Sequence, residues 1–129
     1  MRKLTIHNIR QVNLQPFGEA GIGGEILIPA QLNNQVSLSL IKLGADEAFA
    51  PHFHPSDHIL VIMEGSGQLD CSEGDSRTVY ELREGDVVPV PSQLVHAFAA
   101  TAEGCTFLAF AVPARPLKHP ERLVPVAGK

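Results

Sequence analysis

The chain contains no tryptophan, a single tyrosine and only two cysteines among its 129 residues. Cys71 and Cys105 form no Cys-x-x-Cys motif, and an isolated pair says little about pairing. We therefore expect two reduced residues that pack as small hydrophobic side chains. The tyrosine, Tyr80, suggests no role by its position. The sequence also lacks an apolar run long enough to span a bilayer, so we expect no association with membranes.

Basic residues are too few and too scattered to form a nucleic-acid-binding surface. The net charge at neutral pH is −4, and lysines and arginines do not cluster on any one segment. A phosphate backbone would find no broad positive field, so nucleic acid is not an expected partner. The N-terminus is basic, but neither a long apolar segment nor a small-residue cleavage site follows it. The expected location is the cytoplasm.

Short apolar runs alternate with glycine-containing turns and predict a single all-β domain over residues 1–129. The core barrel should cover about residues 24–112, flanked by a first strand at 4–10, a glycine-rich connector at 21–24 and a proline-rich C-terminal arm. Apolar residues occupy both faces of the segment after His58, so either a second sheet layer or a second copy should cover the outer face, and a homodimer is expected. In the segment 35–43, Ser37 and Ser39 share one face, which should meet either solvent or a polar pocket. The strands are expected at 25–28, 35–43, 48–54, 58–63, 68–71, 77–82, 86–90, 95–100 and 105–112.

Four histidines, His52, His54, His58 and His96, predict one metal site. Alternate residues of a strand face the same side, so His52 and His54 should point together. The short turn that follows brings His58 near them, and His96 must arrive from a distant strand. Imidazole is a ligand for Fe, Mn, Ni, Cu or Zn, and a neutral four-histidine shell would leave the full charge of the ion in place. The chain's two other histidines have no such neighbours, and we assign His7 and His119 no role.

Two segments that contain these histidines resemble the two motifs of the cupin superfamily. The first motif, Gly-x5-His-x-His-x3-4-Glu-x6-Gly, is matched by His52, His54, by His58 in place of the Glu, and by Gly65. The second, Gly-x5-Pro-x-Gly-x2-His-x3-Asn, is matched by Gly85, Pro91 and His96. Gly44 lies two residues too far from His52, and Gln93 and Ala100 replace the second motif's Gly and Asn. The resemblance implies a double-stranded β-helix, a jelly-roll-like barrel that usually forms dimers, with an all-histidine metal site.

The faces that point inward predict a mainly apolar pocket around the metal. Leu60, Ile62, Leu94 and Phe98 should line it, with Phe107 or Phe110 added according to strand parity. Asp57 is either a support for one of the histidines or a solvated turn carboxylate. No other acid or base falls on these faces, which favours chemistry centred on the metal.

Three functions are compatible with such a site, because a fold determines function poorly. The first is an oxidoreductase of the dioxygenase type that acts on a small organic substrate. The second is an isomerase, lyase or decarboxylase that uses the metal as a Lewis acid. The third is a module that binds or senses a small ligand without turnover.

Overall fold

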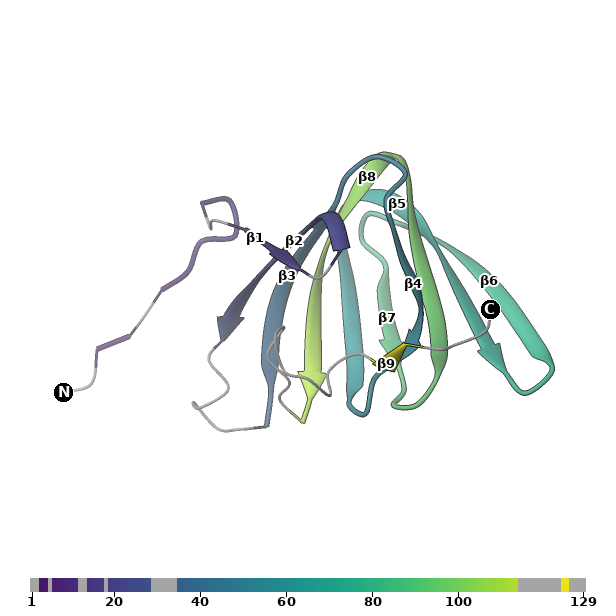
Figure 1. Cartoon of the computed structure of the whole chain (residues 1–129). Coiled ribbons are helices and arrows are strands. Elements are labelled where there is room, and N and C mark those ends of the chain that lie inside the picture. Colours follow the sequence, from purple (N-terminus) through teal and green to yellow (C-terminus); the bar gives the residue numbers. More distant parts are fainter. Residues whose placement is uncertain are drawn as a thin grey trace.

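The computed structural model describes residues 3–4, 6–11, 14–17, 19–28, 35–113 and 124–125. Within these residues all regular elements are strands, and every strand pairing is antiparallel (Figure 1). The described residues contain no helix with the length and hydropathy needed to cross a bilayer. The predicted all-β class is confirmed. The strands are β1 (Gln15–Phe17), β2 (Glu19–Ile28), β3 (Ser37–Leu43), β4 (Ala48–Phe53), β5 (Asp57–Glu73), β6 (Ser76–Arg83), β7 (Val87–Val90), β8 (Val95–Val112) and β9 (Val124–Pro125).

Two long strands, β5 and β8, organise the sheet. β5 pairs with β6, β7 and β8, while β8 pairs with β3, β4 and β5. β5 pairs with β7 along its first half and with β6 along its second half. In the same way, β8 pairs with β4 along its first half and with β3 along its second half. The sheet therefore curls around a common interior instead of lying flat (Figure 1).

Each of these long strands was expected as two strands separated by a glycine turn. The structure instead has one bent strand in each case, and the register between β5 and β8 shifts on both sides of Glu64 and Gly65. Gly65 and Gly104 have φ angles of 76° and 74°, so both glycines adopt the left-handed conformation that the turn prediction required. The conformation was predicted correctly, but it bends a continuous strand instead of ending one.

The N-terminal predictions were wrong in two places. Residues 4–10 form no strand where the structure describes them, and Leu4 and Ile6 are each 87% exposed. Apolar alternation alone does not make a strand when no neighbouring strand supplies hydrogen bonds. The expected connector at residues 21–24 lies inside β2, which pairs with β1 and β3. At the other end, Val124–Pro125 pairs with β4, whereas the rest of the predicted C-terminal arm, including His119, lies outside the described residues apart from Pro113.

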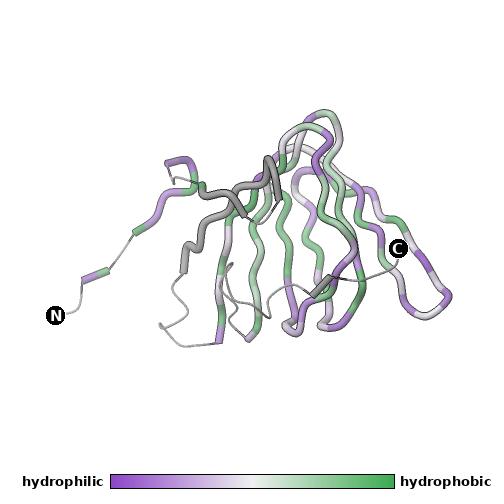
Figure 2. The backbone as a smooth tube through the Cα atoms, viewed as in Figure 1, coloured by the Kyte–Doolittle hydropathy of each residue, from purple (hydrophilic) through white to green (hydrophobic). Residues whose placement is uncertain are grey.

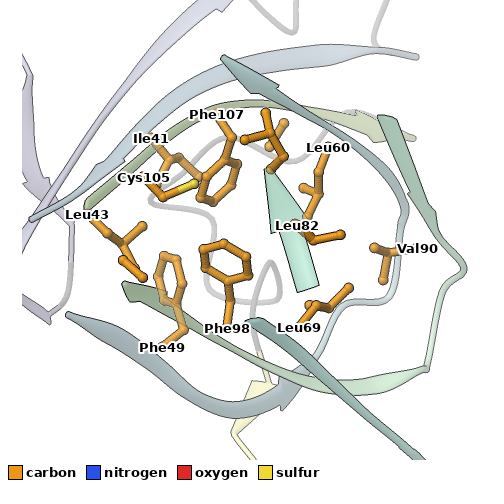
Figure 3. Close-up of a cluster of buried hydrophobic side chains, with 13 residues drawn as sticks. Ile41, Leu43, Phe49, Leu60, Leu69, Leu82, Val90, Phe98, Cys105 and Phe107 are labelled. Carbon is orange, nitrogen blue, oxygen red and sulfur yellow. The ribbon is translucent and has the colours of Figure 1, made fainter. Parts of the chain in front are cut away.

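The core lies inside the curl of the sheet. Large side chains from six strands, β3 to β8, point toward one another there (Figure 3). Hydrophobic residues follow the central strands, and hydrophilic residues gather toward the tip of the β5–β6 hairpin (Figure 2). Burial of each large side chain contributes about 1.5–3 kcal/mol, so the cluster supplies a major part of the stability. Outside the barrel, Ile59, Val87 and Val112 remain exposed, and the homodimer stays a prediction.

Candidate metal centre

Three of the four predicted ligands converge inside the barrel. His52 lies on β4 and is paired with His96 on β8, while His54 follows the end of β4. One ligand atom from each of the three lies within 4.8 Å of the others, and all three side chains are buried. The strand parity that predicted a shared direction for His52 and His54 is therefore confirmed. The three imidazoles are close enough to bind one ion.

Backbone carbonyls orient two of these rings. The Nδ1 atom of His52 lies 2.6 Å from the Ala50 carbonyl oxygen, and that of His96 lies 2.8 Å from the Leu94 carbonyl oxygen. When each Nδ1–H donates to its carbonyl, the lone pair remains on Nε2, which is then the atom available to a metal. The donor set therefore fits a divalent transition ion.

Burial also favours the ligand form of His96. Removal of its ring from water lowers the pKa of His96 below the ordinary value, and the hydrogen bond to the Leu94 carbonyl opposes this only in part. The imidazole therefore stays neutral at neutral pH. A metal can bind the Nε2 atom of His96 without first displacing a proton.

His58 lies beside the group but outside it. Its ring is stacked on that of His54, with a centroid distance of 4.0 Å and an interplanar angle of 17°. His58 is buried and lines the same cavity as the other three histidines. Its ring nitrogens lie outside the group of ligand atoms that His52, His54 and His96 form. Its role as a fourth ligand stays a prediction.

The histidines face a small cavity of about 40 Å³ with apolar walls. Two predicted lining residues, Leu60 and Phe98, form part of the wall, together with Phe107. Ile62 is buried in the core cluster, and Leu94 lines a larger neighbouring groove instead. No carboxylate lines this cavity in the part of the chain that the structure describes. The residues that strand parity missed are Ile41, Phe49, Leu69 and Ala109, which come from four different strands.

The loops that carry the two motifs are joined by hydrogen bonds. The Ser92 amide donates to Asp57 Oδ1 at 2.8 Å, and the Gln93 amide donates to the His54 carbonyl oxygen at 2.9 Å. Asp57 therefore holds the backbone of the opposite loop. This role differs from both predicted ones, a support for a histidine ring and a solvated turn carboxylate. These bonds fix the loop that leads into His96 against the end of β4.

Two serines form a polar strip on the inner face of β3. Ser37 and Ser39 are both 0% exposed, which excludes the solvent alternative of the sequence analysis. Ser39 is paired with Ala109, a wall residue of the histidine cavity. The Ser39 hydroxyl has no hydrogen-bond partner among the described residues, so it is available to a polar atom beside the cavity.

The chain is similar in sequence or in fold to several known proteins. Acireductone dioxygenase of Leishmania braziliensis is 26% identical over 106 residues, which is 81% of this chain but only 26% of that protein. The chain thus spans about a quarter of the length of the curated relatives it matches. Among solved structures, the polyketide cyclase RemF of Streptomyces resistomycificus has a TM-score of 0.78 at 20% identity, over 98% of this chain and 88% of that chain. KdgF of Halomonas sp. has a TM-score of 0.73 at 20% identity, over 86% and 96% of the two chains.

The solved structures establish the fold, since their identities are low, and the family assignment depends on the sequence itself. A family profile described as Cupin matches residues 27–119, which include β3 to β8 and all four histidines. The matched region thus contains the six strands that form the core and the loops of both motifs. The chain belongs to the cupin family.

Proposed function

We propose that this protein is a metal-dependent enzyme of the dioxygenase type that acts on a small organic substrate at the histidine cavity. The observation that carries the proposal is the buried convergence of His52, His54 and His96. The partial similarity to acireductone dioxygenases supports the same reaction class. Among the described residues the cavity walls contain no acid or base besides the four histidines, which favours chemistry at a metal over catalysis by side chains alone.

A redox-active divalent ion, Fe, Mn, Ni or Cu, would supply electron exchange with dioxygen and polarisation of a substrate oxygen. The protein's own residues orient the ligands and exclude water. Because the three imidazoles are neutral ligands, the site would favour an anionic oxygen group on the substrate. The cavity is small, so only the reacting end of a substrate fits beside the histidines.

Oxygen uptake after metal loading tests the proposal. The metal-free protein is loaded separately with Fe, Mn, Ni, Cu and Zn, and each form is assayed with diketone, flavonoid and thiol substrates in an oxygen electrode. We expect substrate-dependent oxygen uptake with at least one redox-active metal and none with Zn. His96→Ala should abolish it, whereas His7→Ala is the matched control, because His7 is exposed and distant from the site in sequence.

Two results would contradict the oxidoreductase assignment. Product formation without oxygen, with Zn as active as Fe, would support the isomerase, lyase or decarboxylase alternative. Ligand binding by the loaded protein without any product would support a binding module.

A further inference from the structure

A second hollow, a groove of about 590 Å³, lies next to the histidine cavity. Its floor includes Leu69, Leu82 and Val90, which are buried and lie together at one side of the core cluster (Figure 3). Leu69 also lines the histidine cavity. One side chain thus borders both the groove and the candidate metal centre.

The groove is open because two strands do not meet. β6 and β7 each pair with β5, and no ladder joins them to each other in the described part of the chain. Their inner faces are therefore left partly uncovered. Tyr80 lies on the same face of β6 as Leu82, and it is 51% exposed although it lines the groove.

The groove has the size of a small-molecule site, whereas the histidine cavity does not. Ligand pockets typically have volumes of about 300–1,000 Å³. The groove falls within that range, and the cavity of about 40 Å³ holds only a few atoms. A substrate whose reacting end reaches the histidines needs room for its remaining atoms, and the adjoining groove provides it.

The lining selects the charge of the occupant. Glu73 and Asp86 are its charged residues, and both are acidic. The nearby cation, Arg77, is outside the lining and is bound to Asp70 by a hydrogen bond of 2.9 Å from Nε to Oδ1. Among the described residues that line the groove, none carries a positive charge that would balance an anion, so an anionic group is disfavoured there. Several hydroxyl groups line the groove as well, and they can bond to neutral oxygen atoms: Ser72, Ser76, Thr78 and Tyr80.

We propose that this groove is the substrate-binding site of the enzyme, and that it takes a flat, largely apolar molecule without negative charge on its groove-bound part. The ring of Tyr80 is the contact surface for that molecule, and Leu69, which lines both hollows, borders the end of the molecule that reaches the histidines. The assignment as a substrate site rests on the proposed function, because the reaction itself takes place in the histidine cavity.

Binding of two naphthalene probes tests the groove directly. Because the chain has one tyrosine and no tryptophan, its intrinsic fluorescence reports on Tyr80 alone. We expect uncharged 2-naphthol to quench this emission saturably, with or without metal. In the metal-free protein, the anion 2-naphthoate should bind about tenfold more weakly than 2-naphthol because of the acidic lining. Glu73→Gln should narrow that difference between the two probes.

Matched variants on β6 separate the groove from non-specific binding. Tyr80→Ala should weaken 2-naphthol binding about fivefold in isothermal titration calorimetry, since an aromatic contact is lost. Val79→Ala is the control, because Val79 is the neighbouring residue, is 45% exposed and does not line the groove. Far-UV circular dichroism should show that both variants keep the fold, since both side chains are largely exposed.

The possible failures are distinguishable. Absence of saturable 2-naphthol binding, or equal binding by wild type and Tyr80→Ala, would overturn the groove assignment. Conversion of a dimer to a monomer by Tyr80→Ala in sedimentation velocity would also overturn it, because the groove would then be an interface between copies. Specific 2-naphthol binding by a protein that takes up no metal would leave the groove as a ligand site and refute the proposed enzyme.

Discussion

Substitution of Gly65 by alanine tests the close packing of the two long paired strands, β5 and β8. Gly65 has a φ of 76° and is paired with Cys105 on β8. A Cβ atom at this position would lie 2.0 Å from the Gly104 carbonyl oxygen and 2.8 Å from its carbonyl carbon. Both are backbone atoms, so β5 and β8 would have to separate to admit the methyl group. We therefore expect this glycine of the first motif to be required for strand contact as well as for backbone angle.

Gly74 provides the matched control for the size of the effect. Its φ is 59°, and a Cβ atom there would meet nothing within 4 Å. Gly74→Ala should therefore cost only the backbone strain, about 1 kcal/mol, partly offset by the lower entropy of the unfolded chain. Gly65→Ala adds the displacement of two paired strands, for a total of about 3–5 kcal/mol, in the range of the most destabilising point mutations.

Urea unfolding followed by far-UV circular dichroism measures the difference. For an m value of about 2 kcal/mol/M, a gap of about 2–4 kcal/mol between the variants separates their midpoints by about 1–2 M. Equal losses of unfolding free energy for Gly65→Ala and Gly74→Ala would refute the close approach of Gly65 to Gly104.

Three further predictions concern the site and its surroundings. Gln93 has a φ of 71°, so Gln93→Gly should raise the unfolding free energy by about 0.5–1 kcal/mol while its amide still donates to His54; a loss of stability in urea would contradict this. Burial lowers the pKa of His96, so the unfolded chain binds the proton more readily than the folded chain does. The metal-free protein should therefore lose stability as the pH falls below 6.5. A His96→Gln variant whose melting temperature falls as much as that of the wild type between about pH 7.5 and 5.5 would refute this. Burial raises the pKa of Cys105 to about 11, and burial together with the charge of Asp70 raises the pKa of Cys71. Both thiols should therefore react slowly with a disulfide reagent at about pH 8 and rapidly in urea. Fast labelling of Cys105 in the native protein would contradict its burial.

The histidine group was largely predictable, in part from local strand geometry and in part from the resemblance to the second motif. Side chains two residues apart on a strand share a face, which placed His52 with His54, and the spacing of the second motif brought His96 to them. The stacking of His58 on His54 was not predictable, because a side-chain torsion depends on packing that the backbone pattern does not determine. Sequence therefore located the site and not the arrangement of every ring.

Long-range pairing accounts for the other differences. A glycine at positive φ can end a strand or bend one, and only the partner strand decides between these outcomes, as at Gly65 and Gly104. The groove depends on the missing pairing between β6 and β7, which their own residues do not indicate. Tyr80 accordingly suggested no role by position, although it lines the larger hollow.

Metal content together with an anomalous difference map tests the central claim most directly. We expect one ion per chain, with Nε2 of His52, Nε2 of His96 and one ring nitrogen of His54 at about 2.0–2.2 Å. His96→Ala should lose the ion, and His58→Ala shows whether the stacked ring is a fourth ligand, in which case bound metal falls sharply. A protein that takes up no stoichiometric metal from any of the five ions, or an anomalous peak away from these histidines, would contradict the metal centre.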